Sequence, residues 1–281
     1  VIKGAEFKGL ENTEAALVKS YGGKLLFGTS NISDSDIPQN KHTSASEVID
    51  RIKIRRFAER HNLSGSQLKD VFQEINNMNI IVLGDLIVDE YVDCSDVGMS
   101  RENPSLVVTP TNENWFVGGA GIVAMHAASL GAKLEFITSV GESTATHFAQ
   151  KELEKYGVKN DFLRAFGHET VVKRKYFLNG SALLRVNKFP KSYPGSEYEE
   201  SIITKISEKI EKTDAIILAD FNYGTLSKKL VSKIIKMARK GNVFISGDSQ
   251  SSSQIGKIGS FKKCNLISLT EYEARLALQE Q

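Results

Sequence analysis

The stretch DAIILADFNYGTLSKKLVSKIIKMARKGNVFISGD, residues 214–248, decides the fold, because it holds two strand patterns with one helix pattern between them. Residues 214–220 and 242–248 are short apolar runs rich in Ile, Val and Phe, and each ends at an Asp. Residues 227–241 have apolar side chains at helical spacing and end at a Gly. A strand, a helix and a second strand of these lengths predict two parallel strands joined by a crossover helix.

The same alternation continues in both directions along the chain. Further strand patterns occupy residues 80–85, 133–141 and 264–269. Further helix patterns occupy residues 120–132, 145–157 and 197–213. Strands that alternate with helices of this length predict an α/β fold of the doubly wound kind, a mainly parallel sheet with helices on both faces.

Two stretches interrupt this alternation. Residues 105–117 and 170–189 alternate polar side chains with aromatic or aliphatic ones, which is typical of half-buried strands. Asn179-Gly180 lies inside the second stretch and is a strong signal for a tight hairpin turn. We expect these pieces to form a small separate sheet, a β-lid that packs over one edge of the main domain.

The composition excludes several classes of protein. The 281 residues carry a formal net charge of +2, with Lys and Arg spread along the chain, so we expect no binding to nucleic acid or to a membrane surface. No apolar run is long enough to cross a membrane. Cys94 and Cys264 lie far apart, which argues against a disulfide framework or a zinc site and favours a cytoplasmic protein. Because the sequence starts without Met and stops inside a helix pattern, we expect a piece of a longer protein.

Two acids and two glycines are the first candidates for a binding site. Ligands bind beyond the carboxyl ends of parallel strands, so Asp85 at a strand end and Asp89 one turn later should point into that crevice. Carboxylates suit the vicinal hydroxyls of a sugar. The alternative, that Asp85 caps a turn and Asp89 is solvated, stays open on these residues alone. Gly118 and Gly119 precede a helix of small residues and would leave backbone N–H groups open to a polar or anionic ligand.

Taken in order, eight motifs resemble those of the ribokinase/PfkB family of sugar kinases. The resemblance covers about residues 79–281 and is closest to the branch that phosphorylates heptose 7-phosphate in ADP-heptose synthesis. It implies a ribokinase-like fold and a part in making an activated sugar for lipopolysaccharide or another surface polysaccharide. The motifs are GDLIVDEY, SRENPSLVV, VGGAGIVA followed by LGA, TVVKRKYF, LLRVN, ILADFNYGTLS, SGDSQ and LISLTEYEA.

On the sugar side, the resemblance implies a pocket in which acids bind hydroxyls, the glycine pair closes around the substrate, and cations on the lid take the phosphate of a sugar phosphate. The residues are Asp85, Asp89, Glu102, Gly118, Gly119, Lys173 and Arg185. Glu102 would lie on the β-lid near the sugar. For Lys173 and Arg185 the alternative is an ordinary exposed charge on a strand.

On the nucleotide side, the resemblance implies ATP, with its Mg²⁺ as the only metal, and in-line transfer of the γ-phosphoryl group to a sugar hydroxyl. The residues that would order nucleotide and Mg²⁺ are Asp220, Asp248, Ser268 and Glu271. The family's catalytic base lies in a Gly-Ala-Gly-Asp loop. That motif does not occur in these 281 residues, so we expect the base beyond Gln281 and no turnover by these residues alone.

Residues 1–55 resemble a different protein, the C-terminal part of a cytidylyltransferase-type nucleotidyltransferase. The positions carried over are Lys3, in the nucleotide-binding corner, and Thr43, Ser44 and Ser46, before the last helix. Residues 56–78 read as a helical linker, and 79–281 as the kinase domain without its C-terminal catalytic part. The expected protein is a bifunctional kinase and nucleotidyltransferase.

Several positions depart from the family pattern. Ile122 replaces an Asn after the glycine pair, Asn222-Tyr223 replaces a Gly-Lys, and Ser268 replaces the Asn of an Asn-x-x-Glu element. Each change removes a polar contact to sugar or nucleotide. Two functions therefore stay open: an ATP-dependent sugar or sugar-phosphate kinase, and a degenerate, non-catalytic domain that binds a sugar phosphate or scaffolds the transferase. A homodimer through the β-lid is compatible with both.

Overall fold

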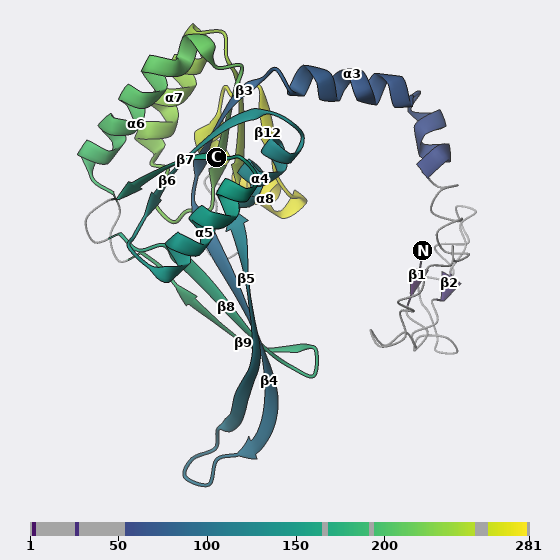
Figure 1. The fold of residues 1–281 in the computed structure, drawn as a ribbon, viewed down its shortest axis with the longest axis vertical. Helices are drawn as coiled ribbons and strands as arrows, with labels where there is room; N and C mark the ends of the chain where they lie inside the picture. The colour runs from purple at the N-terminus through teal and green to yellow at the C-terminus, as the bar shows by residue number, and fades with distance from the viewer. Residues whose placement is uncertain are drawn as a thin grey trace. The chain divides into compact units, whose positions relative to one another are not determined.

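The computed structural model describes residues 2–3, 26–27, 54–164, 168–190, 194–250 and 258–279. The chain divides into two compact units, Val1–Ser64 and Gly65–Gln281. The second unit holds a body, built on a parallel sheet, and a lid, built on a smaller sheet that extends from the body (Figure 1).

The body is a sheet in which every neighbouring pair of strands is parallel, with helices running between the strands, so the predicted doubly wound fold is confirmed. The strands lie in the order β12 (Leu266–Ser268), β11 (Phe244–Ser249), β10 (Ala215–Asp220), β3 (Asn79–Gly84), β6 (Lys133–Val140) and β7 (Lys159–Arg164). The helices are α4 (Ala120–Ser129), α5 (Thr144–Lys155), α6 (Ser196–Lys209), α7 (Lys228–Lys240) and α8 (Glu271–Gln279), with short 3-10 helices η3 (Ile210–Lys212) and η4 (Ile258–Phe261).

The body sheet has a hydrophobic layer on each face. Ile81 and Leu83 of β3 pack in the layer under α6 and α7, whereas Val82 between them packs in the layer under α4 and α5. Phe261 and Phe136 are fully buried in these two layers, respectively. Because both faces are covered, the body strands read as continuous apolar runs in the sequence.

The lid is a four-stranded sheet in the order β5 (Leu106–Gly119), β4 (Leu86–Met99), β8 (Val171–Leu178) and β9 (Ser181–Lys188). Two antiparallel hairpins, β4 with β5 and β8 with β9, are joined through the parallel pair β4 and β8. Asn179 and Gly180 connect β8 to β9 with φ angles of 51° and 77°, as the predicted hairpin turn requires. The buried carboxylate of Glu90 pairs with Arg174 and ties the hairpins together.

The sequence patterns miss two strands. β7 pairs with β6 at the sheet edge, although its sequence KNDFLR shows no strand alternation. Only Asp85 separates β3 from β4, so Asp89 lies within a strand, and the expectation that it follows in a turn is wrong. The chain leaves the body sheet at Gly84 and continues directly as a lid strand. The sequence contains no turn signal at this point.

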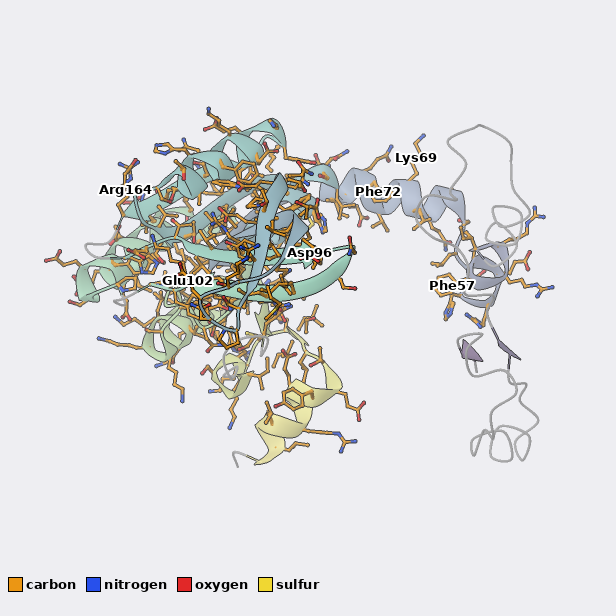
Figure 2. All side chains as sticks on the ribbon, turned by 90° about the horizontal axis from the view of Figure 1, so that it is seen from below. Phe57, Lys69, Phe72, Asp96, Glu102 and Arg164 are labelled. Carbon is orange, nitrogen blue, oxygen red and sulfur yellow. The ribbon has the colours of Figure 1, made fainter. Side chains whose placement is uncertain are left out.

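The remaining described elements precede the body in the sequence. The first unit contains the parallel strands β1 (Ile2–Lys3) and β2 (Leu26–Phe27) and a helical stretch at 54–60. In the second unit, α3 (Gly65–Ile75) buries none of its residues, and Phe72, labelled in Figure 2, is exposed on it. None of the helices in the described ranges has the length and apolar character needed to cross a membrane.

Gly84→Ala is expected to destabilise the body, because a Cβ there would lie 2.0 Å from the carbonyl oxygen of Ala219 on β10. Overpacking of this kind lowers the free energy of unfolding by about 1–3 kcal/mol. Urea denaturation followed by circular dichroism measures the loss. Gly259→Ala is the control, since Gly259 is exposed in η4 and its Cβ would meet nothing within 4 Å, and it should cost less than about 0.5 kcal/mol. Equal losses in the two variants would contradict this packing.

Candidate functional site

Asp85 lies between β3 and β4, at the carboxyl edge of the body sheet. It is only 2% exposed, and its carboxylate accepts hydrogen bonds from the loop that follows β10. Oδ2 accepts from the N–H of Phe221 at 2.8 Å and of Tyr223 at 3.1 Å, and Oδ1 accepts from the N–H of Thr225 at 2.9 Å. Asp85 therefore holds the 221–225 loop. Its oxygens do not form the open hydroxyl-binding edge that the resemblance implies.

Gly118 and Gly119 end β5 and lead directly into α4. A Cβ on Gly118 would lie 2.6 Å from Oδ2 of Asp89, and a Cβ on Gly119 would lie 2.4 Å from the main-chain oxygen of Asp85. Gly119 also has φ 59° and ψ −139°, a conformation that side chains disfavour. The N–H of Ala120 donates to that same Asp85 oxygen at 2.9 Å. The absence of side chains thus lets the start of α4 approach both acids.

The inner face of the lid is the face that carries Ile87, Asp89 and Tyr91 of β4 and meets the 221–225 loop. The strand register places their cross-strand neighbours on the same face, in rows that step away from the body. The proximal row is Gly118, Ile87 and Val171; the polar row is Phe116, Asp89, Lys173 and Asn187; the outer row is Asn114, Tyr91, Lys175 and Arg185.

Lys175 links the polar row to the outer row. Its Nζ lies 3.4 Å from Oδ1 of Asp89 and donates to the hydroxyl of Tyr91 at 3.0 Å. The side chains of Asp89 and Lys175 keep 23% and 20% exposure, and Arg185 beside them is exposed. The inner face therefore presents an accessible carboxylate next to two cations. Sequence reasoning missed Lys175, which the spacing Lys173-x-Lys175 along one strand could have revealed.

Tyr223 joins the 221–225 loop to the inner face of the lid. It is 2% exposed and packs with Ile87 and Val171 of the proximal row. Its ring stacks on Phe189, with centroids 5.2 Å apart and planes 17° from parallel. The Nζ of Lys173, a residue only 9% exposed, lies over the ring at 5.3 Å from its centroid. Lys173 is thus a buried cation of the site and not an ordinary exposed strand charge.

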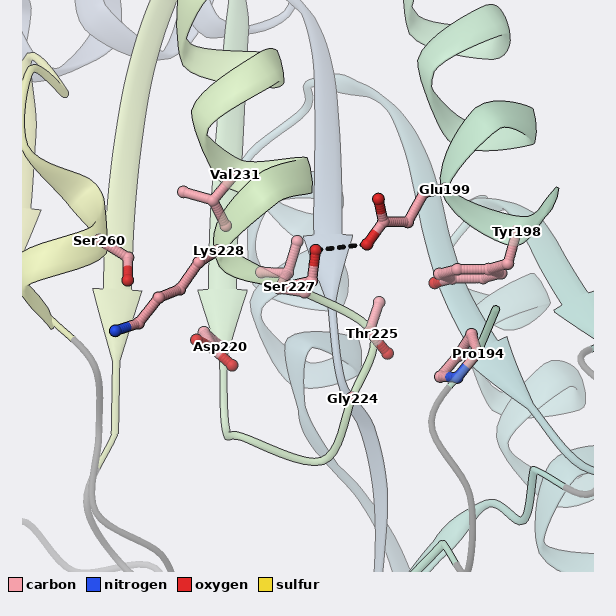
Figure 3. A pocket seen from close by; sticks show the side chains of 11 residues that line it. Pro194, Tyr198, Glu199, Asp220, Gly224, Thr225, Ser227, Lys228, Val231 and Ser260 are labelled. Atoms are coloured by element: carbon pink, nitrogen blue, oxygen red, sulfur yellow. Dashed lines mark hydrogen bonds between the residues drawn. The ribbon is translucent and has the colours of Figure 1, made fainter. Parts of the chain in front are cut away.

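Asp220, at the carboxyl end of β10, lines a cavity of about 260 Å³ (Figure 3). The same cavity is lined by Lys228 from the first turn of α7 and by Thr225 and Ser260. Oδ1 of Asp220 accepts a hydrogen bond from the N–H of Asn222 at 2.9 Å. A carboxylate, an ammonium group and hydroxyls around one cavity suit a phosphate-bearing ligand with its cation.

Asp248 and Ser268 are register partners on β11 and β12, so they lie side by side at the same edge. Burial raises the pKa of the Asp248 carboxyl above its usual range, and the negative charge of Glu273 raises it further. A cation bound here would relieve both effects. Glu271, at the start of α8, is exposed and pairs with Arg275 at 2.7 Å. Within the described residues no three His, Cys, Asp or Glu side chains gather into a metal site.

Other predicted positions lie apart from this site. Glu102 is in the exposed turn between β4 and β5, where Figure 2 labels it. The part of β4 that runs from Asp89 to Met99 separates Asp89 from that turn. An extended strand of this length spans roughly 33 Å. The expectation that Glu102 lies near the sugar site is therefore not met within one chain. Lys3 is in β1, but its side chain, like Thr43, Ser44 and Ser46, falls outside the described part of the structure.

The sequence matches a known family over most of the second unit. The family model for pfkB family carbohydrate kinases matches residues 77–281. A curated relative, the Bifunctional protein HldE of Helicobacter acinonychis, is 29% identical over 204 residues, which are 71% of this chain and 42% of the relative. The chain therefore spans less than half the length of this relative.

Solved structures share the fold at low sequence identity. The phosphofructokinase-2 of Escherichia coli, in complex with potassium, has a TM-score of 0.55 and 13% identity over 72% of this chain and 63% of its own. The ribokinase of Arabidopsis thaliana, complexed with ribose and ATP, has a TM-score of 0.51 and 12% identity over 72% of this chain and 67% of its own. These likenesses show a ribokinase-like fold.

Asp85→Asn is expected to release the 221–225 loop. A carboxamide keeps one acceptor oxygen and turns N–H groups toward backbone N–H groups that now donate to a carboxylate. Each buried N–H that loses its acceptor costs about 1–3 kcal/mol, so the free energy of unfolding should fall by roughly 2–4 kcal/mol. Hydrogen exchange should become faster at the amides of Phe221, Tyr223 and Thr225.

Asp214→Asn is the matched control for that change. The carboxylate of Asp214 also accepts a backbone N–H, that of Asn79 at 2.7 Å, but in an exposed position. Its loss should cost less than about 1 kcal/mol and leave exchange in the 221–225 loop unchanged. Unaltered protection of the three loop amides in Asp85→Asn would show that Asp85 does not hold the loop.

Proposed function

Since the chain belongs to the pfkB family of carbohydrate kinases, we propose that it binds a sugar phosphate on the inner face of the lid and serves its ATP-dependent phosphorylation. The observation that carries the proposal is an accessible carboxylate, Asp89, that pairs with Lys175 of the outer row, where Arg185 is the cross-strand neighbour of Lys175. A sugar phosphate has both complements of such a surface, hydroxyls for the acid and a phosphate for the cations.

The distances between Asp89 and the outer-row cations fit the size of a sugar phosphate. Neighbouring strands lie about 4.8 Å apart, and residues two apart on one strand lie about 6.6 Å apart. Asp89 on β4 and Arg185 on β9 are therefore about two strand spacings and one row apart. A sugar ring on the polar row would bring a phosphate on its far carbon to the outer row, where Lys175 and Arg185 can pair with it.

ATP would bind at the carboxyl edge of the body, where Asp220 and Lys228 line the cavity beside the 221–225 loop. Asp220, Asp248, Ser268 and Glu271 are the residues we propose for nucleotide and Mg²⁺. The raised pKa of Asp248 next to Glu273 fits a cation at this edge. When bound, ATP with Mg²⁺ supplies the phosphoryl group and neutralises charge on it.

The chain's own residues would act by binding and orientation. Asp89 accepts hydroxyl hydrogen bonds, while Lys175 holds that carboxylate in place through the ion pair at 3.4 Å. Asp85 fixes the 221–225 loop between the two ligands, so the attacking hydroxyl and the phosphoryl group meet in a defined geometry. Burial of Tyr223 and Lys173 keeps water from the base of the lid.

The finer assignment rests on the relatives. Because a matching relative is a Bifunctional protein HldE, we propose a heptose 7-phosphate-like substrate and a place in nucleotide-activated sugar synthesis. We also propose that residues 1–55 belong to an attached nucleotidyltransferase, as their resemblance implies, and that the protein works in the cytoplasm.

A degenerate binding domain is the second candidate, and the position of Tyr223 favours it. A buried phenol occupies the loop position at which the related motif has a Lys, and Ile122 packs into the apolar layer under α4 and α5. ADP release measured on the natural full-length protein separates the two. Release that depends on a sugar phosphate supports the kinase, whereas binding without release supports the degenerate domain.

The lid also suits a homodimer, which we include in the proposal. Tyr91 lies between Phe116 and Phe177 on the inner face, with ring centroids 5.2 Å and 5.6 Å away. Phe116 remains 51% exposed. A second copy of the lid would cover this aromatic surface and bury Phe116.

Asp89→Asn should weaken sugar-phosphate binding by about 10-fold to 100-fold, because it removes charge-assisted hydrogen bonds to hydroxyls. Calorimetric titrations with D-sedoheptulose 7-phosphate, D-mannose 6-phosphate and D-ribose 5-phosphate measure the affinities, and the heptose phosphate should bind tightest. Asp93→Asn, an exposed change on the same strand, is the control and should bind like wild type. Wild-type affinity in Asp89→Asn, or no binding of any of the three by wild type, would refute the proposed site.

Phe116→Glu should convert a dimer into a monomer, because it places a charge in the aromatic surface that the second copy would cover. Light scattering after size-exclusion chromatography should give twice the mass of one chain for wild type and the mass of one chain for the variant. Phe244→Glu changes a similarly exposed Phe at the start of β11 in the body and should leave the mass unchanged. A monomeric wild type would exclude the lid dimer.

A further inference from the structure

Two buried polar atoms at the base of the lid have no hydrogen-bond partner. They are the hydroxyl of Tyr223 and the side-chain oxygen Oδ1 of Asn187. Two other such atoms in the described residues lie elsewhere, on Glu169, which faces Lys188 at 3.4 Å, and on Tyr198 of α6. Because an unsatisfied buried polar atom destabilises the fold, two of them on residues that both neighbour Lys173 point to a group that is still to be bound.

Tyr223 is held so that only its hydroxyl is left without a partner. Its N–H donates to Asp85, and its ring stacks on Phe189 and packs on Ile87 and Val171. The phenol cannot turn toward another partner without breaking that stack. Its hydroxyl is therefore a fixed hydrogen-bonding group, able both to donate and to accept.

Asn187 shares this part of the site through the strand register. It is the cross-strand partner of Lys173, so the two side chains lie on the inner face in the polar row with Asp89. Lys173 in turn reaches over the ring of Tyr223. The ammonium group of Lys173 therefore has the carboxamide of Asn187 as its cross-strand neighbour, the phenol ring of Tyr223 beneath it and Asp89 beside it in the polar row.

The kinds of hydrogen bond still unmade define the group that fits. The oxygen of Asn187 needs a donor, the phenol of Tyr223 takes either role, and the ammonium of Lys173 needs an acceptor. A sugar hydroxyl donates and accepts, so it can serve all three. A phosphate dianion offers acceptors alone and would leave the oxygen of Asn187 without a donor.

We infer that Tyr223 and Asn187, with Lys173, form a subsite for a hydroxyl group of the sugar and help to determine which sugar is selected. The inference rests on the proposed function, because it adds this subsite to the proposed sugar-phosphate site at Asp89. Its residues are distinct from the outer-row cations Lys175 and Arg185, which take the phosphate. The replacement of a loop Lys by Tyr223 thus leaves the base of the lid with a neutral phenol and a cation supplied from β8.

The test compares two variants of the 281-residue chain with wild type. Tyr223→Phe removes the hydroxyl and keeps the ring that stacks on Phe189, and Asn187→Leu removes the carboxamide at similar size. Calorimetric titration with the same three sugar phosphates should show each variant binding about 10-fold more weakly. Binding of inorganic phosphate should be unchanged in both, whereas Arg185→Gln should weaken sugar phosphate and inorganic phosphate alike.

A thermal melt without ligand separates binding from a structural role. Tyr223→Phe should melt at the wild-type temperature or above it, because it removes an unsatisfied buried hydroxyl. Tyr176→Phe is the control: its hydroxyl accepts from Arg174 at 3.5 Å, it lies on the opposite face of the lid, and its affinity should equal that of wild type.

Three results would overturn the inference. Wild-type sugar-phosphate affinity in both variants would remove the subsite, and equal weakening for inorganic phosphate would assign it to phosphate. A lower melting temperature in Tyr223→Phe would mean that the hydroxyl is structural, provided that Asn187→Leu also binds normally. If wild type bound none of the sugar phosphates, the proposed function would fail instead, and the subsite with it.

Discussion

The carboxylate of Asp85 is the interaction on which the rest of the site depends. It accepts N–H groups from Phe221, Tyr223 and Thr225 and so ties the end of β3 to the loop after β10. The loop places Thr225 beside the cavity of the body and Tyr223 against the lid. A single buried acid thus sets the positions of the groups that would face both ligands, which explains why an acid stands at the end of an apolar strand.

The strand register determines which polar side chains lie together on the inner face of the lid. Because side chains alternate along a strand, one register brings Asp89, Lys173 and Asn187 into a row on the inner face, while Glu90 and Arg174 pair on the other face. A slip of one residue would exchange the two faces. The Glu90–Arg174 ion pair and the tight turn at Asn179-Gly180 both favour the observed register. The hydrogen-bond ladder of the lid therefore determines which side chains lie on its inner face.

Sequence patterns predicted the body well because they report burial directly. Continuous apolar runs marked the strands that are covered on both faces, and the Asn179-Gly180 turn marked the second lid hairpin. The patterns failed where a strand is not covered on both faces and where no turn signal separates two strands. β7 is an edge strand with little apolar character, and β4 starts one residue after β3, so Asp89 was placed in a turn and not in a strand.

The sequence by itself determined the alternating α/β body, the presence of a separate lid, and the acids, glycines and cations from which a sugar-phosphate site is made, because these follow from local pattern and residue type. Only the tertiary structure decided what each of them does. In the structure Asp85 holds the 221–225 loop, and Asp89 is the accessible acid. The structure also brings Lys175, Asn187 and Tyr223 to the proposed site. Asp85 lies 136 to 140 residues from the amides that it holds, and Lys175 lies 84 residues from Tyr91. Contacts at such separations are set by register and packing, which no local pattern records.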